Sequence, residues 1–143
     1  MMTPLRKITV AALAPIALAL ASCSVSVPDS YDTADNMPAI TPDYTDITIP
    51  ANIAPLNFRI DAEGDDYVTH LYTGADREGF AVGGRTLDIP LDRWHSLIGE
   101  AAGDTLYADV YVQNGGKWTR HASVRNAIAD SIDRYISYRL IEP

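Results

Sequence analysis

Cysteine, the residue type with the most distinctive chemistry in this chain of 143 residues, occurs once, as Cys23. A single cysteine excludes a disulfide within the chain. It leaves intermolecular pairing, a reactive thiol or covalent modification. Cys23 directly follows an apolar run and two small residues, Ala21 and Ser22. This position favours modification, so we expect the Cys23 thiol to carry a covalent group.

The segment before Cys23 has the organisation of a secretory signal. Arg6 and Lys7 make the leading region positive, and the apolar run over residues 8–20 follows. This run is too short to span a bilayer, which needs about 20 residues. We therefore predict a signal peptide over residues 1–22 that is removed from the mature protein. An ordinary cleaved signal with an incidental cysteine is the alternative.

The motif Leu20-Ala21-Ser22-Cys23 resembles the bacterial lipobox. The resemblance implies cleavage between Ser22 and Cys23, a diacylglyceryl group on the thiol, and usually an acyl chain on the new amino terminus. Two or three acyl chains anchor a protein stably, whereas one alone binds weakly. Ser24 follows Cys23, in place of an aspartate that would indicate inner-membrane retention. We therefore expect a lipid-anchored protein of the cell envelope, at the outer membrane by analogy.

A second group of chemically capable residues lies on one predicted strand. Tyr107, Asp109 and Tyr111 alternate with apolar residues and should point outward, and Trp118 extends this face across a predicted hairpin. Aromatic rings beside a carboxylate can stack on sugars or anchor a protein partner. Ordinary outward strand residues, or a face covered by another layer, are the alternative.

The remaining polar residues predict no catalytic or metal site. His70, His95 and His121 do not have the spacing of a His-Glu-x-x-His zinc motif. The acidic turn over residues 61–66 lacks the ligand order of a calcium loop. We expect a protein that is not an enzyme and that holds no cofactor.

The elements that position these residues are predicted to be mostly strands. Apolar and polar residues alternate over residues 46–49, 54–60, 67–72, 80–82, 85–89, 105–113, 117–124 and 135–141. Asn114-Gly115-Gly116 predicts a tight hairpin turn. The pattern favours a mainly β fold, an antiparallel immunoglobulin-like β-sandwich. A small open barrel is the alternative.

One segment breaks this period of two. Leu91, Trp94, Leu97 and Ile98 recur at helical spacing after Pro90. We predict one short helix over residues 90–98, with Trp94 covering the core.

Composition divides the mature chain into a tether and a domain. Residues 23–42 hold several aspartates and prolines and few bulky apolar side chains, so we predict an acidic flexible tether. The β-sandwich domain is predicted over residues 43–143. A net charge of −8 argues against nucleic-acid partners, because phosphate backbones require a basic surface. Negative charge also disfavours direct binding to anionic lipid headgroups, so membrane contact should come from acyl chains on Cys23.

Four stretches of the predicted domain carry a family resemblance, and they are residues 49–58, 89–94, 116–119 and 135–143. They resemble the amino-terminal region of large Bacteroides-type lipoproteins, in which a TolB-like β-propeller and a Cys-x-x-Cys-His haem-attachment motif follow. This sequence has neither the motif nor propeller repeats. Haem and propeller functions are therefore not carried over. We expect residues 43–143 to be the first domain of a longer protein, with a complete small lipoprotein as the alternative.

Two functions remain open at this point. The first is a non-enzymatic interaction or scaffolding module of the cell envelope that binds an envelope protein. The second is an accessory glycan-binding domain that uses the outward aromatic residues.

Overall fold

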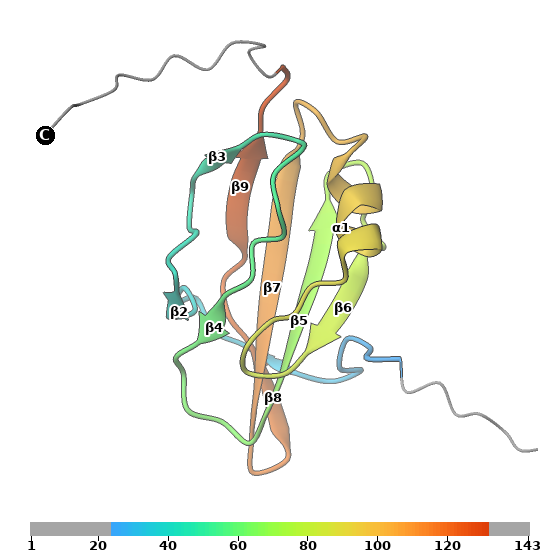
Figure 1. The fold of residues 1–143 in the computed structure, drawn as a ribbon. Coiled ribbons are helices and arrows are strands. Elements are labelled where there is room, and N and C mark those ends of the chain that lie inside the picture. The colour runs from blue at the N-terminus through green and yellow to red at the C-terminus, as the bar shows by residue number, and fades with distance from the viewer. Residues whose placement is uncertain (1–23, 132–143) are drawn as a thin grey trace, which may run out of the picture.

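A computed structural model describes residues 24–131, and this part contains nine β-strands and one α-helix (Figure 1). In chain order these are β1 (Asp32–Thr33), β2 (Ile40–Thr41), β3 (Thr48–Ile49), β4 (Arg59–Ile60), β5 (Asp66–Thr73), β6 (Phe80–Gly83), α1 (Leu91–Ile98), β7 (Thr105–Asn114), β8 (Lys117–Arg120) and β9 (Val124–Ile128).

The central strand of the main sheet is β7. On one side it pairs with β5 in antiparallel fashion, and β6 forms the edge beyond β5. On the other side, the first half of β7 pairs with β9 and its second half pairs with β8. Two short strands extend this side in parallel, β1 beside β8 and β3 beside β9. A separate two-stranded sheet joins β2 and β4.

The core lies between the main sheet and a covering layer. That layer contains β2, β4 and α1, which lie in front of the main sheet in Figure 1, together with the irregular segments that directly precede β4 and α1. Inward side chains of β7 such as Val110 and Val112, at 0% and 2% exposure, belong to the same core cluster as Ile60 of β4 and Trp94 of α1, both at 0%. The predicted mainly β class with one short helix is confirmed, and the layers are consistent with a β-sandwich. The pairing is mixed rather than purely antiparallel, and the immunoglobulin-like type stays a prediction.

The predicted helix is confirmed as α1, over Leu91–Ile98. Its buried side chains are Trp94, Leu97 and Ile98, whereas Leu91 is 55% exposed. The Trp94 indole N–H donates a hydrogen bond of 2.8 Å to the carbonyl oxygen of Ile53, which satisfies its polar atom inside the core. The predicted core role of Trp94 is therefore confirmed.

The predicted hairpin joins β7 to β8. Asn114 pairs with Lys117, and the two glycines between them have φ angles of 56° and 81°. Two successive positive φ angles match the twist of a tight hairpin and suit glycine, which has no Cβ to clash. The hairpin prediction is confirmed, with Gly115 and Gly116 as its central residues.

The predicted strand over residues 85–89 is wrong. Only one isolated bridge forms there, between Thr86 and Arg59. Further along, the Ile89 N–H donates to the side-chain oxygen of Asn57 at 3.0 Å, so a side chain replaces the ladder. Leu87 and Ile89 are buried as their alternation implied. The alternating pattern therefore predicted the burial of Leu87 and Ile89 correctly, but it did not predict how the backbone of this segment is hydrogen-bonded.

The segment predicted as a flexible tether, residues 23–42, is partly built into the fold. In the described portion, β1 pairs with β8 and β2 pairs with β4. Ile40 is only 7% exposed and belongs to the core. The packed structure thus begins before residue 43, because backbone pairing and one well-placed apolar side chain hold a segment of otherwise polar composition.

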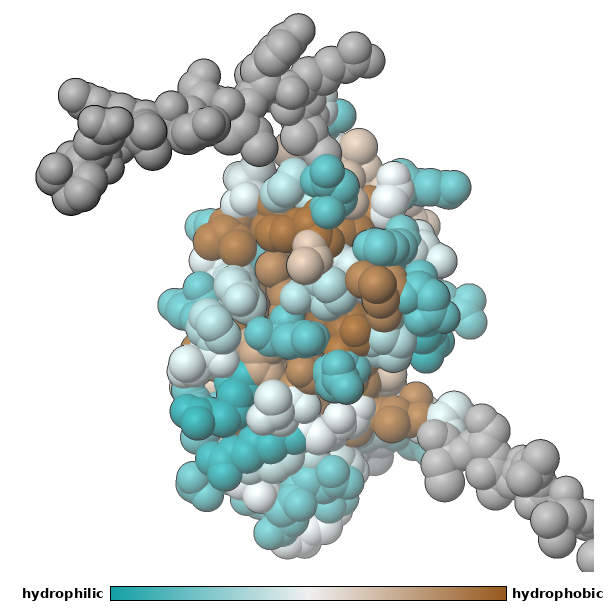
Figure 2. All heavy atoms as spheres, in the orientation of Figure 1, coloured by the Kyte–Doolittle hydropathy of each residue, from teal (hydrophilic) through white to brown (hydrophobic). Residues whose placement is uncertain are grey.

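The covering side of the molecule has an uneven surface. Figure 2 shows hydrophobic residues gathered over its upper half and hydrophilic residues at the lower end, where Figure 1 places the β7–β8 hairpin. No helix in residues 24–131 has the length and apolarity to cross a membrane. The predicted signal peptide, Cys23 and the predicted strand over residues 135–141 lie outside the described residues.

Candidate functional site

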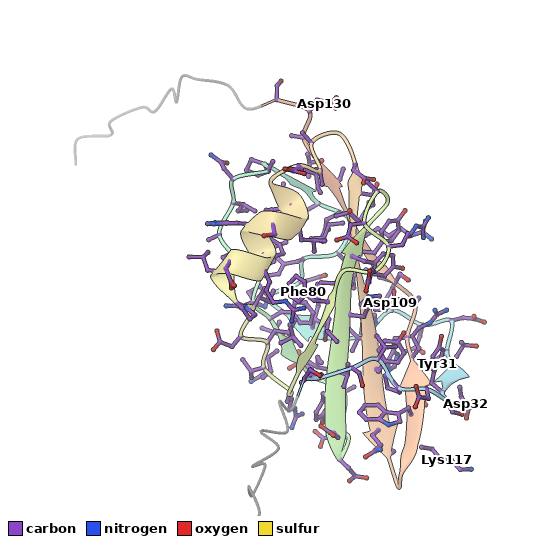
Figure 3. All side chains as sticks on the ribbon, turned by 90° about the vertical axis from the view of Figure 1, so that its right-hand side faces the viewer. Tyr31, Asp32, Phe80, Asp109, Lys117 and Asp130 are labelled. Atoms are coloured by element: carbon purple, nitrogen blue, oxygen red, sulfur yellow. The ribbon has the colours of Figure 1, made fainter. Side chains whose placement is uncertain are left out.

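The predicted interaction residues lie on the face of the main sheet that points away from the core, here called the outer face. In the sheet register Tyr107 pairs with Tyr72, Asp109 with His70, and Tyr111 with Val68. Paired residues share a face, so the alternation along β7 was predicted correctly. Figure 3 labels Asp109 on the side of the sheet away from α1.

Burial differs from the prediction at two of these positions. Asp109 is 4% exposed and Tyr111 is 2% exposed, whereas Tyr107 and Trp118 are half-buried. Asp109 and Tyr111 are therefore not part of an open surface, and for these two residues the alternative of a covered face is the one observed. Another layer of the molecule covers this part of the sheet.

The covering element is a segment that we call the N-terminal strap, residues 25–36. At one end Val25 lies over the outer face of β6, since a β-carbon built on Gly83 would be 3.1 Å from a Val25 methyl group. In the middle the ring of Tyr31 meets Tyr111 edge to face, with ring centres 5.1 Å apart. At the other end the carbonyl oxygen of Asn36 accepts a hydrogen bond of 3.1 Å from the N–H of Ala122. The strap therefore crosses the outer face and covers part of its lower half, including Tyr111.

The burial of Asp109 is compensated by polar partners. The Ser123 hydroxyl donates to Asp109 Oδ1 at 2.5 Å, and the Tyr72 hydroxyl donates to Oδ2 at 3.4 Å. The guanidinium of Arg120 lies 3.8 Å from Oδ2. A buried carboxylate requires such partners, because an unpaired charge in a dry site is costly. These contacts indicate that Asp109 has a structural role on the covered part of the outer face.

Two tyrosines next to Asp109 have raised pKa values. Burial raises the pKa of Tyr72, and the negative charge of Asp109 adds to this effect. Burial likewise raises the pKa of Tyr111 to about 12, again with a contribution from Asp109. Both phenols therefore stay protonated at neutral pH and act as aromatic surfaces and hydrogen-bond donors.

The upper half of the outer face carries a continuous aromatic row formed by His70, Tyr72 and Tyr107. The rings of His70 and Tyr72 stack with centres 4.8 Å apart, and those of Tyr72 and Tyr107 stack at 5.0 Å with planes 10° apart. The guanidinium groups of Arg77 and Arg125 lie 5.7 and 6.0 Å from the centre of the Tyr107 ring. All three ring residues are half-buried, and both arginines are exposed.

The sequence interpretation singled out Tyr107 but missed His70 and Tyr72 as its neighbours. A usable signal was present, because residues 67–72 alternate and would pair antiparallel with residues 105–113. What the sequence lacked was the register between the two strands. Only the observed pairing of Tyr72 with Tyr107 brings the rings into one row.

A surface hollow of about 290 Å³ lies at the lower end of the outer face. Its lining comes from the strap and from the β7–β8 hairpin, and consists of Ser30, Tyr31, Asp32, Gly116, Lys117 and Trp118. Figure 3 places Tyr31, Asp32 and Lys117 together at this end. Of these residues the sequence interpretation identified only Trp118, because the strap was assigned to a tether.

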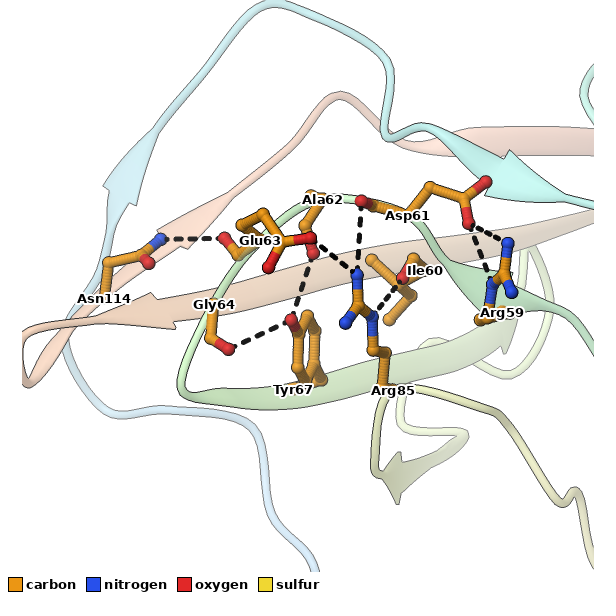
Figure 4. Close-up of polar contacts among 9 residues, drawn as sticks. All are labelled: Arg59, Ile60, Asp61, Ala62, Glu63, Gly64, Tyr67, Arg85 and Asn114. Carbon is orange, nitrogen blue, oxygen red and sulfur yellow. Dashed lines mark hydrogen bonds and ion pairs between the residues drawn. The ribbon is translucent and has the colours of Figure 1, made fainter.

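The acidic turn over residues 61–66 is occupied by contacts within the protein (Figure 4). Asp61 forms an ion pair of 2.7 Å with Arg59, and Glu63 forms one of 3.1 Å with Arg85. The hydrogen bond from Thr41, followed by that from Arg59, lowers the pKa of Asp61. Within residues 24–131, no three histidine, aspartate, glutamate or cysteine side chains are grouped so as to hold a metal ion.

Comparison of the chain with family models, with curated proteins and with solved structures gives no match. The resemblance to the amino-terminal region of Bacteroides-type lipoproteins therefore stays a prediction from the sequence. The functional argument rests on the geometry of the outer face and on the amino-terminal motif.

Proposed function

We propose that this protein is a membrane-anchored bacterial lipoprotein whose β domain is a non-enzymatic interaction or scaffolding module of the cell envelope. The lipobox-like motif ending at Cys23 supports the anchor, and the resemblance to envelope lipoproteins supports the location. Acyl chains on Cys23 hold the domain at the membrane, at the outer membrane by analogy with proteins that have no aspartate after the cysteine.

The observation that carries the interaction function is the aromatic row of His70, Tyr72 and Tyr107 with its two arginines. Tyrosine and arginine are enriched in protein interfaces, where rigid aromatic rings anchor a partner at low cost in conformational entropy. Stacking fixes these rings before any partner arrives. A preorganised, half-exposed row with two exposed arginines at its Tyr107 end suits a protein partner that presents carboxylates.

The polar groups around this row are held by structural contacts, which supports a binding role over a catalytic one. The Nε2 atom of His70 lies 2.8 Å from the carbonyl oxygen of Glu78. Ser123 is engaged by Asp109, which is itself buried. A nucleophile and its base need access to substrate, and these pairs face the protein interior or its own backbone.

The accessory glycan-binding function remains the second candidate, and a different observation favours it. Trp118 lines the surface hollow together with Tyr31 rather than joining the aromatic row. The two candidates therefore use separate parts of the outer face and can be tested separately.

Site-specific photocrosslinking tests the interaction function. A photoreactive amino acid is placed at Arg77, beside the row, and as a control at Glu100, an exposed position that follows α1. We expect a discrete crosslinked protein from native membranes with the first probe only, and its loss when Tyr107→Ala is added. Equal products from both positions, or a product unaffected by Tyr107→Ala, would contradict the proposal.

Membrane fractionation tests the anchor. Cys23→Ser should move the protein out of the detergent-extracted membrane fraction and into a soluble or unprocessed pool. The wild-type protein should co-sediment with outer-membrane vesicles on a density gradient. A processed Cys23→Ser protein that still behaves like wild type would remove the lipoprotein proposal.

A further inference from the structure

The hollow between the N-terminal strap and the β7–β8 hairpin has the composition of a carbohydrate subsite. We propose that it binds a neutral hexose ring of a glycan, with Tyr31 and Trp118 as the aromatic contacts and Asp32 and Lys117 as the hydrogen-bonding groups. This proposal rests on the second candidate function, accessory glycan binding, for which it names one ligand class and one set of residues.

The register of β1 against β8 brings the two aromatic residues together. Asp32 pairs with Thr119 and Thr33 pairs with Arg120, in parallel. Tyr31 directly precedes β1, and its ring lies on the outer face, where it meets Tyr111. Trp118 pairs with Gln113 of β7, which is two residues after Tyr111, so its side chain lies on the outer face as well. Both residues line the hollow.

Tyr31 is held in place before a ligand binds. Its ring meets the ring of Tyr111 edge to face at 5.1 Å, and the guanidinium of Arg120 lies 5.5 Å from its centre. Just beyond β1, the N–H of Ala34 donates a hydrogen bond of 2.8 Å to the carbonyl oxygen of Arg120. Preorganised aromatic surfaces lose little entropy on binding, which favours affinity at a shallow site.

The chemistry of the lining matches a sugar better than an anion. A hexose ring has a face of C–H groups that packs on aromatic rings and a rim of hydroxyls that both donate and accept hydrogen bonds. Asp32 can accept from those hydroxyls, Lys117 can donate to them, and Ser30 can do both. The carboxylate and the ammonium group offset each other in charge, and the whole chain carries −8, so a phosphate or carboxylate ligand is disfavoured.

The size of the hollow also limits the ligand. About 290 Å³ is near the lower end of the range for small-molecule pockets, which begins around 300 Å³. An open hollow of that size suits one or two rings of a longer chain that continues over the surface. We therefore expect the site to take an internal part of an oligosaccharide.

The two tryptophans of the chain make a direct test possible. The full chain, labelled with ¹⁵N-tryptophan and kept in a zwitterionic detergent so that no sugar headgroup competes, gives two indole N–H signals in NMR. Cellohexaose, maltohexaose and mannohexaose serve as probes, with inorganic phosphate for comparison. We expect at least one hexasaccharide to shift the Trp118 signal, while the signal of Trp94, buried and bonded to Ile53, stays fixed.

Variants then assign the contacts, with affinity measured by calorimetry on the sugar that binds. Trp118→Ala should weaken binding about tenfold, which corresponds to ~1.4 kcal/mol. Asp32→Asn, at an exposed position of the strap, should weaken it several-fold without affecting folding. An unchanged Trp94 signal shows that each variant is folded.

Three outcomes would overturn the proposal. They are no shift of the Trp118 signal with any of the sugars, a shift with phosphate alone, and unchanged affinity in both variants. Tyr107→Ala separates this site from the aromatic row, because it should abolish the protein crosslink and leave sugar affinity unchanged. A negative result for one of the two sites therefore does not contradict the proposal for the other.

Discussion

The two faces of β7 are built from alternate residues of one strand and yet are stabilised in different ways. On the inner face Val110 and Val112 are buried by a layer of apolar side chains. On the outer face Asp109 and Tyr111 are equally buried, but by the strap and by polar partners. Burial on the inner face rests on hydrophobic area, whereas burial on the outer face rests on hydrogen bonds and one crossing segment.

This comparison separates two questions that a sequence pattern merges. Alternation states which face of the sheet a side chain is on. It does not state whether that face is covered, because the cover on the outer face comes from a segment more than seventy residues away in sequence. The two halves of the outer face differ in burial for the same reason. Tyr107 in the upper half is partly open to solvent, whereas Tyr111, which the strap contacts, is buried.

The largest effect is expected in the inner layer. Trp94→Ala removes a fully buried ring and its hydrogen bond to Ile53, so it should lower the free energy of unfolding by about 3–5 kcal/mol, as measured by chemical denaturation. Leu91→Ala, on the same helix but 55% exposed, is the control and should change it by less than about 0.5 kcal/mol. Similar losses in the two variants would mean that α1 does not cover the core as described.

The next effect concerns the polar burial on the outer face. Asp109→Ala leaves the Ser123 and Tyr72 hydroxyls without their acceptor, and should cost about 1–3 kcal/mol in the same measurement. Asp109→Asn keeps an acceptor oxygen and should cost less. An Asp109→Ala protein as stable as wild type would show that hydrogen bonding does not sustain burial on this face.

A smaller effect on stability is expected when the strap no longer covers Tyr111, and it can be measured through the titration of this tyrosine at high pH. Burial raises the pKa of Tyr111 to about 12, above the usual value of about 10. Between about pH 10 and pH 12 the native state therefore retains the phenol proton of Tyr111, whereas the unfolded state loses it. The associated stability is fully present below pH about 10 and is lost as the pH rises towards 12. Tyr31→Ala should expose Tyr111 and lower its pKa towards 10, as followed by tyrosinate absorbance.

Two variants serve as controls for that titration. Tyr111→Phe identifies which tyrosine signal belongs to the buried phenol. Tyr44→Phe, at a tyrosine that packs against the core on the other side of the sheet from Tyr111, should leave the high-pH step in place. If Tyr31→Ala leaves the titration of Tyr111 unchanged, the strap does not seal the lower outer face.

The smallest effect on stability is expected at the acidic turn over residues 61–66. Glu63→Gln breaks an ion pair of 3.1 Å with Arg85, but the Glu63 side chain is 89% exposed, so the melting temperature should not change measurably. Tyr67→Phe, in the same contact group, removes a hydroxyl at 3.0 Å from the carbonyl oxygens of Ala62 and Gly64 and should cost about 1 kcal/mol. A reversed order would place the ion pair among the stabilising contacts of the domain.

Much of the fold was predictable because it depends on local patterns. The long strands β5 and β7, the helix α1 and the glycine hairpin all follow from periodicity and turn chemistry within a few residues. The candidate site was predictable only in part. Tyr107 and Trp118 were identified, whereas Tyr31 and Asp32 were missed because their segment has the composition of a tether.

The sequence by itself determined the mainly β class, the helix with Trp94 in the core, and the face of β7 on which Tyr107, Asp109 and Tyr111 lie. These features depend on the side-chain period and on turn residues, which are local properties. Only the tertiary structure decided the parallel pairing of β1 with β8, the burial of Asp109 and Tyr111, and the meeting of Tyr31 with Trp118 at one hollow. Those features depend on register and on a distant crossing segment, and local patterns carry no information about which distant segments pair.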